Sequence, residues 1–406
     1  MFDAIKKTFS PLLGLFIFAL GSGFFLTLLS LAMHEHNEPP MLIGIMTSMF
    51  FAGLVCGSLC LEPFIIRVGH IRAFSAFASA LAVISLLHGI FYNMPFWLVL
   101  RFLTGVGTTG IFLVIESWLL STSTDTTRGR IVSLYMITFY ASEALGQLLI
   151  NFGEPNDLLL YGMAAMLCSL SVIPLTITRA PMPQLTDASS MKLSTLYKKT
   201  TSALFGCFFA GMILSAAYGL LPILFEEIYD DTSQVSIMMF CLILGGMLLQ
   251  YPVGKCSDLF DRRLVVIIIS LGAIIASVML IETIHIYIYA LVLTTLFGGF
   301  ATTVYPICIS YACDKLEQKD ILSGIRGLLL SYSLGSTIGP FVAPVFMHGP
   351  HETYLFFYFI LIFSATTLLF TYQKIKKESP PQEEPFQIMR HTTSIMSEID
   401  PRSDLE

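Results

Sequence analysis

The chain has 406 residues and a net charge of −6; 55% of its residues are hydrophobic and only 12% are charged. An ordinary soluble domain carries about 25% charged residues, so this composition excludes one. Together with a mean hydropathy of +0.77, it indicates an integral membrane protein.

Hydropathy divides the chain into twelve apolar runs, each long enough for one helix to cross a hydrocarbon core of about 30 Å. Stretches such as LVVIIISLGAIIASVMLI do not alternate in polarity, which excludes the strands of a membrane barrel. The predicted spans are residues 10–33, 41–66, 73–91, 95–121, 131–151, 158–178, 201–225, 234–256, 264–282, 285–312, 321–347 and 353–374.

Basic residues occur in alternate loops. The loops HEHNEPP, GEPND and EEIYDDTS contain no Lys or Arg, whereas those on the other side of the predicted bundle are basic. Because cytoplasmic loops retain basic residues, we expect both termini in the cytoplasm. The first apolar run is too long for a cleavable signal peptide, so it is predicted to stay as a span.

Two ionisable residues lie at similar depth in the predicted fourth and fifth spans. An ionisable side chain at the centre of a span costs about 2.5–3.5 kcal/mol, so each needs a partner or a function. At about 1.5 Å per residue, Arg101 and Glu143 both lie in the outer half of the membrane. We therefore predict an ion pair or a water-bridged contact between them, which is either static or opened by substrate or a proton.

Glu116 lies near the inner end of the fourth span. Its predicted partners are the hydroxyls of Ser133 and Tyr135, or the loop residues Arg128 and Arg130. Two roles stay open: a latch between the fourth and fifth spans, or a proton carrier whose pKa is raised by partial burial.

The polar segment 179–200 divides the chain into two sets of six spans. We predict an N-terminal bundle at 1–178, a cytoplasmic linker at 179–200, a C-terminal bundle at 201–374 and a disordered cytoplasmic tail at 375–406. A shift of 192–193 residues sets Ser142 over Gly335 and Gly146 over Gly339, which indicates an internal duplication.

Uncharged polar side chains in the spans of the second half are candidate walls of a substrate cavity. They suit an amphipathic solute that is neutral or cationic. The candidates are Ser215, Tyr218, Gln250, Tyr251, Tyr305 and Tyr332.

The segment GKCSDLFDRR resembles the signature loop of the major facilitator superfamily. RFLTGVG, VIESWLL, VYPICISYACDKLE and LLLSYSLGSTIGP are similar to its YcaD-type bacterial branch. The resemblance implies an all-α protein of twelve transmembrane helices in two pseudo-symmetric six-helix bundles, with a substrate site near the midplane. It also implies that the protein lies in a bacterial inner membrane.

The same resemblance implies a cytoplasmic gate loop. Asp258 can pair with arginine or accept N–H groups at a helix end, locking helices together. The first-half copy departs from this pattern, because Ile66 stands where an acidic residue is expected. The predicted gate residues are Asp258, Arg262, Arg263, Arg67 and Arg72.

The expected function is secondary transport of a small organic solute by alternating access, coupled to protons. No G-x-x-x-x-G-K-[ST] string is present, so ATP is not the expected energy source. We expect a monomer in the bilayer, with no cofactor, metal site, nucleic-acid partner or enzyme activity. A non-translocating receptor or accessory protein is the alternative, and siderophore or drug export versus nutrient uptake stays open.

Overall fold

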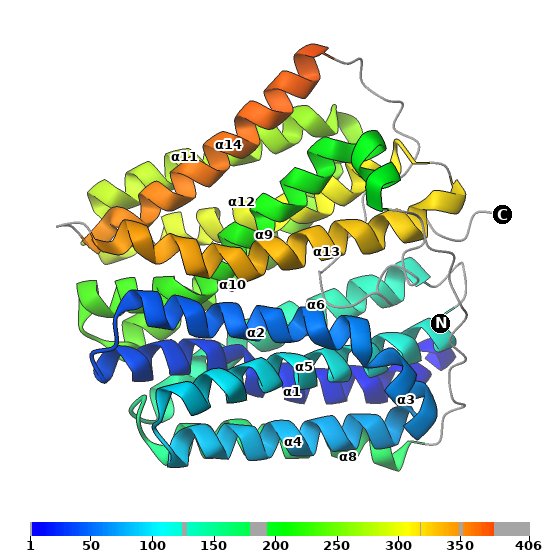
Figure 1. The fold of residues 1–406 in the computed structure, drawn as a ribbon, viewed down its shortest axis with the longest axis vertical. Coiled ribbons are helices and arrows are strands. Elements are labelled where there is room, and N and C mark those ends of the chain that lie inside the picture. Colours follow the sequence, from blue (N-terminus) through cyan, green and yellow to red (C-terminus); the bar gives the residue numbers. More distant parts are fainter. Residues whose placement is uncertain (1, 124–127, 179–192, 317, 349–351, 377–406) are drawn as a thin grey trace.

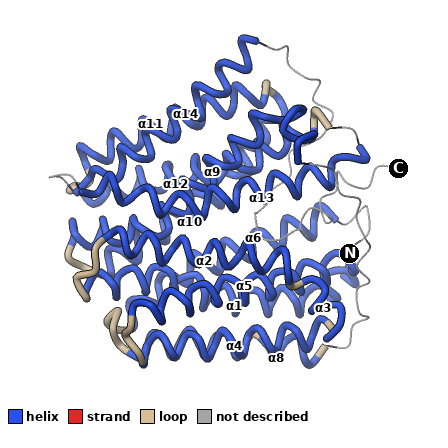
Figure 2. The backbone as a smooth tube through the Cα atoms, in the orientation of Figure 1, coloured by secondary structure: helices blue, strands red, loops and turns tan. Residues whose placement is uncertain are grey.

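The computed structural model describes residues 2–123, 128–178, 193–316, 318–348 and 352–376. Within these residues the protein consists of long, roughly antiparallel helices and their connections, and contains no strand (Figure 1, Figure 2). The α-helices are α1 (Phe2–Glu35), α2 (Pro40–Cys60), α3 (Glu62–Val68), α4 (His70–Ile90), α5 (Met94–Thr122), α6 (Arg128–Gln147), α7 (Leu158–Leu170), α8 (Val172–Ile177), α9 (Leu193–Tyr229), α10 (Thr232–Leu259), α11 (Arg262–Thr283), α12 (Tyr287–Cys313), α13 (Gln318–Val342) and α14 (Leu355–Lys376). The 3₁₀ helices are η1 (Leu148–Phe152), η2 (Ala343–His348) and η3 (Glu352–Tyr354).

Eleven helices in the described residues are long and apolar enough to cross a membrane, with α7 and α8 forming one of them. The predicted fifth span is also helical, as α6, but its sequence is more polar because it carries Arg130, Ser142, Glu143 and Gln147. Its 20 residues extend about 30 Å, the thickness of the hydrocarbon core. The prediction of an all-helical membrane protein is therefore confirmed.

Two predicted boundaries are corrected. The second predicted span, 41–66, is interrupted after Cys60, and a separate short helix, α3, begins with Pro63 in its first turn, where proline is tolerated. Helix α9, which corresponds to the seventh predicted span, starts at Leu193, inside the predicted linker, and bends at Thr200. Residues 179–192 of the linker and 377–406 of the predicted tail lie outside the described part of the chain.

The helices pack in the same pattern in both halves of the chain. In the first half α1 packs on α6, α2 on α5 and α4 on α7; in the second, α9 packs on α13, α10 on α12 and α11 on α14. The halves meet through α2 with α13 and α6 with α10, and Figure 1 shows α1–α8 on one side of this boundary. The molecule is thus two pseudo-symmetric six-helix bundles.

Glycines at matching positions explain why equivalent helices cross so closely. A Cβ on Gly53 of α2 would lie 2.1 Å from the carbonyl oxygen of Phe102 in α5. At Gly245 of α10, 192 residues later, it would lie 1.8 Å from the carbonyl oxygen of Thr295 in α12. Only glycine allows this approach of two backbones, as is common in membrane helix pairs. The predicted duplication therefore appears as a repeated packing contact.

Neutral contacts join the two halves near the α1–α2 connection, and we call this end of the molecule the closed end. Ser30 Oγ of α1 donates to the carbonyl oxygen of Gly219 in α9 at 2.9 Å. A Cβ on Gly44 of α2 would lie 2.0 Å from the carbonyl oxygen of Pro340 in α13. The halves therefore touch backbone to backbone at the closed end.

Candidate functional site

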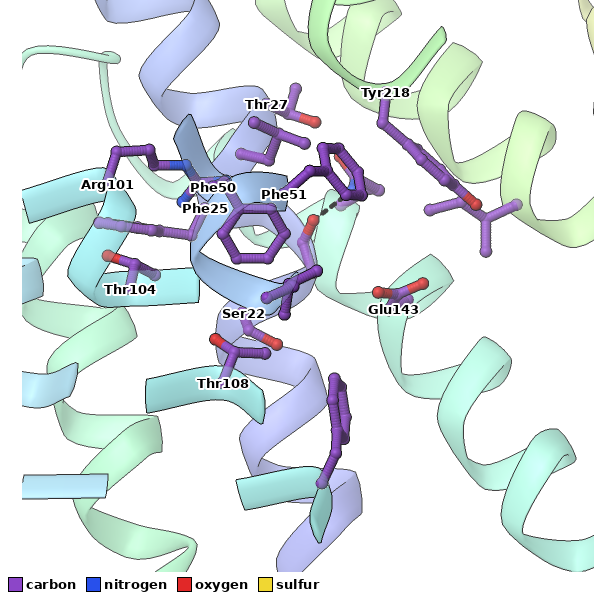
Figure 3. Close-up of a pocket in the computed structure, with 16 residues that line it drawn as sticks. Ser22, Phe25, Thr27, Phe50, Phe51, Arg101, Thr104, Thr108, Glu143 and Tyr218 are labelled. Carbon is purple, nitrogen blue, oxygen red and sulfur yellow. Dashed lines mark hydrogen bonds between the residues drawn. The ribbon is translucent and has the colours of Figure 1, made fainter. Parts of the chain in front are cut away.

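A cavity of about 100 Å³ lies at the boundary between the two halves. Its walls come from α1, α2, α5 and α6 of the first half and from α9 and α10 of the second, the last two through Tyr218 and Ile243 (Figure 3). Most of the lining surface is apolar, although seven of the sixteen lining residues are polar or charged; apart from Tyr218, the ionisable ones are Arg101 and Glu143. This combination of mostly apolar walls with a smaller number of polar groups is typical of small-molecule sites.

The polar wall of α5 follows from helical spacing. Arg101, Thr104 and Thr108 are three and four residues apart and all line the cavity, as residues with this spacing share one helix face. The Thr104 hydroxyl donates to the carbonyl oxygen of Leu100 at 2.8 Å, so towards the cavity it can only accept a hydrogen bond.

Arg101 is buried, with 2% of its surface exposed. Its Cζ lies 4.3 Å from the centre of the Phe50 ring and 5.9 Å from that of Phe25, both cation–π contacts. Its Nε has no hydrogen-bond partner, and no ion pair within the described residues involves it. The predicted direct pair with Glu143 is therefore not formed.

Arg101 and Glu143 nevertheless line the same cavity. Figure 3 shows the Arg101 side chain reaching the ring of Phe50 from one side, with Glu143 on the other. The depth argument led to two residues that line one cavity, but it contains no information on the direction in which each helix turns its side chain. A water-bridged contact stays a prediction.

Gln147, one helical turn beyond Glu143 on α6, is a cavity residue that sequence reasoning missed. Its Nε2 donates to the carbonyl oxygen of Gly23 in α1 at 2.6 Å, which assigns the other amide atom as Oε1. This buried oxygen has no hydrogen-bond partner within the described residues. The i, i+4 spacing from Glu143 is the signal that could have revealed it.

Glu116 is fully buried and accepts a hydrogen bond of 2.7 Å from the Tyr135 hydroxyl. The predicted contact between α5 and α6 through Tyr135 is thus confirmed, whereas Ser133 donates instead to the carbonyl oxygen of Gly129. The Arg128 side chain lies outside the described residues. Tyr305 of the second half is within electrostatic range of Glu116, so this carboxylate lies near the boundary between the halves.

The six predicted cavity residues separate into three groups: two line a cavity, three are buried away from the walls of these cavities, and one is exposed. Tyr218 lines the central cavity and Tyr332 a smaller one beside it. Tyr305 is buried with its ring centre 4.7 Å from that of Tyr332, and Ser215 and Gln250 are also buried.

Neither Ser215 nor Gln250 lines the central cavity. The Ser215 hydroxyl donates to the carbonyl oxygen of Gly211 at 2.7 Å, and Gln250 donates to the Tyr140 hydroxyl at 3.3 Å, linking α10 to α6. Tyr251 is 70% exposed on α10, so its assignment to the cavity is wrong. The sequence identifies polar residues by type, but the direction of each side chain decides which of them face inward.

The predicted gate loop of the second half forms what we call the clamp: Asp261, Arg262, Arg263 and Asp314. Arg262 Nε lies 2.8 Å from Asp314 Oδ2 at the end of α12, and both side chains are 1% exposed. Asp258, expected to be the main partner, lies 3.8 Å from Arg262 and is 36% exposed. Asp314, which sequence reasoning missed, is therefore the principal acid.

Arg263 completes the clamp. Its Nη2 lies 2.8 Å from Asp261 Oδ2, and its Nη1 donates to the carbonyl oxygen of Gln373 in α14 at 3.2 Å. Asp261 also accepts from the backbone N–H of Arg263 at 2.9 Å and so caps α11. These recorded contacts tie α11 to α12 and α14, all within the second half.

The matching loop of the first half has no such arrangement in the described residues. Arg67 and Arg72 are exposed, and no recorded ion pair involves either. The substitution of Ile66 for an acidic residue, noted in the sequence, agrees with this difference.

Comparison with known proteins extends these observations. The family model described as Major Facilitator Superfamily matches residues 12–201 and 203–398. The uncharacterized MFS-type transporter YcaD of Salmonella paratyphi A is 28% identical over 360 residues, 88% of this chain and 93% of the relative. YcaD of Salmonella heidelberg is 28% identical over 349 residues, 85% and 90% of the two chains.

Solved structures share the fold at low identity. The nucleoside transporter NupG has a TM-score of 0.74 at 13% identity and covers 92% of this chain and 100% of its own. A D-xylose-proton symporter has a TM-score of 0.72 at 14% identity and covers 94% and 98%. Because the family model matches almost the whole length, this multi-pass membrane protein belongs to the major facilitator superfamily of transporters.

Proposed function

We propose that the protein is a proton-coupled secondary transporter that moves a small organic solute across the bacterial inner membrane by alternating access. The observation that carries this proposal is the cavity between the two halves, which is lined by Arg101 and Glu143 and separated from one end of the molecule by the closed-end contacts. In this proposal residues 1–178 and 201–374 move as two bodies, as a monomer, with both termini in the cytoplasm.

Proton coupling is assigned to Glu143 of the first half. Glu143 lines the cavity, so a proton on it is sensed directly by a bound solute. Glu116 is enclosed and hydrogen-bonded to Tyr135, which favours the latch role for it. The related fold of a D-xylose-proton symporter supports coupling to protons without identifying the solute here.

Proton flux in proteoliposomes tests the proposal. Wild type, Glu143→Gln and Glu116→Gln are reconstituted and challenged with a panel of organic anions, neutral metabolites and organic cations. We expect solute-evoked proton movement in wild type and in Glu116→Gln, and its loss in Glu143→Gln with solute exchange retained. Solute movement without protons in all three proteins would refute the coupling, and saturable binding without any movement would refute transport.

A further inference from the structure

We propose that the solute is a small organic monoanion that also carries a hydrogen-bond donor, such as a short hydroxycarboxylate, and that Arg101 and Gln147 are its polar ligands. This inference rests on the transport function proposed above and names the class of solute for the same cavity. It differs from the neutral or cationic solute expected from the uncharged residues of the second half.

The first observation is the state of Arg101. The guanidinium is 2% exposed and lines the cavity. Its recorded neighbours within the described residues are the rings of Phe50 and Phe25 and, within electrostatic range, His88, none of which is an acid, and its Nε has no hydrogen-bond partner. A buried cation is normally paired with an acid, because burial removes its hydration. Aromatic faces offset only part of this loss, so an anionic group in the cavity is the missing partner.

The second observation is independent and comes from α6. Gln147 uses its Nε2 for the carbonyl oxygen of Gly23, and its Oε1 is buried without a donor. A buried acceptor without a partner is costly, and the residue lines the same cavity. A hydroxyl or amine on the solute would satisfy it.

The walls set the remaining features of the solute. Phe51, Leu54 and Phe112 also line the cavity and favour an apolar body, while the volume of about 100 Å³ lies below the range of about 300–1,000 Å³ that holds drug-sized ligands. Glu143 is the acid that an anion would meet there, and its protonation, proposed above, removes the repulsion.

Equilibrium binding to the full chain in lipid nanodiscs tests the inference without transport. The probe is radiolabelled 2-hydroxybutyrate. Three unlabelled competitors are compared: 2-hydroxybutyramide lacks the charge, butyrate lacks the hydroxyl donor, and 1-amino-2-butanol carries the opposite charge. We expect the amide to bind about 10- to 100-fold more weakly than the acid, and butyrate to be weaker by a smaller factor.

Variants locate the effect. In Arg101→Met the acid and the amide should bind equally, whereas Arg101→Lys should keep part of the preference. Arg130→Met, which removes an exposed arginine at the start of α6, is the matched control and should bind as wild type does. Size-exclusion profiles and melting curves verify that each variant is folded.

Three results would overturn the inference: equal or tighter binding of the amide or the amine, unchanged preference in Arg101→Met, or no saturable binding of either acid at millimolar concentration. Anion binding without flux would leave the ligand assignment standing and refute the transport proposal. Flux of a cation with no anion binding would do the reverse.

Discussion

Arg262 in the second half and Arg101 in the first are equally buried, each with 2% of its surface exposed, but their surroundings differ. Arg262 lies 2.8 Å from the carboxylate of Asp314, whereas Arg101 lies over the ring of Phe50 and faces a cavity. The charge of Arg262 is neutralised by an acid of the protein, whereas the charge of Arg101 faces a cavity that a solute could enter. Equal burial thus accompanies an ion pair within the protein in one half and the proposed binding role in the other.

The largest expected effect comes from breaking the clamp. Asp314→Asn leaves Arg262 buried without its principal acid, and we expect a loss of about 3–5 kcal/mol in the free energy of unfolding. Thermal and denaturant melts of the purified protein in detergent measure it. The double variant Arg262→Met with Asp314→Leu, which buries no charge, should recover most of the loss. If Asp314→Asn alone were as stable as wild type, the clamp would not stabilise the fold.

A smaller effect is expected at the buried acid of the first half. Tyr135→Phe removes the donor to Glu116 and should lower the free energy of unfolding by about 1–3 kcal/mol. Tyr251→Phe is the matched control, because that side chain is 70% exposed and should change nothing. Equal melting of both variants would mean that the Glu116 contact is not a latch.

Arg101→Met sharpens the comparison most directly. Because the methionine removes a buried charge and keeps an apolar chain, we expect stability to be unchanged or to rise by about 1 kcal/mol, while binding of the organic anion is lost. The same melts and the nanodisc binding assay measure the two effects. A loss of stability as large as that of Asp314→Asn would make Arg101 a structural residue and erase the contrast between the halves.

The smallest effect is expected at the first-half counterpart of the clamp. Arg67→Ala removes an exposed arginine with no recorded ion pair, so the free energy of unfolding should change by less than about 1 kcal/mol. Melting of this variant beside Asp314→Asn in one detergent checks it. A large loss would show that both loops act as clamps.

Sequence reasoning succeeded where a property depends on one helix at a time. Hydropathy located the helices, and depth along α5 and α6 led to the contact of Glu116 with Tyr135 and to the shared cavity of Arg101 and Glu143. It failed where the direction of a side chain or a distant partner decides the outcome. Asp314 pairs with a residue 52 positions earlier across two helices. Tyr218 of α9 faces the cavity, whereas Tyr251 of α10 is exposed.

The glycine contacts show a middle case. A shift of 192–193 residues, together with matched loop lengths and basic loops, indicated a duplication in the sequence, although matches of small residues alone are weak because they occur by chance. In the structure Gly53 and Gly245 each meet a carbonyl oxygen of the helix that crosses theirs. The structure therefore adds the contacts that equivalent residues make, which the sequence does not contain.

The close approach of Gly44 to the carbonyl of Pro340 also bears on how the molecule responds to its surroundings. This contact and the hydrogen bond from Ser30 to Gly219 contain no ionisable group, so the free energy needed to part them should vary little with ionic strength or pH. In a transporter coupled to protons, such a seal would be equally stable at the pH on either side of the membrane. Sensitivity to the proton would then reside in the cavity, and the seal would open only when the helices move apart as whole bodies.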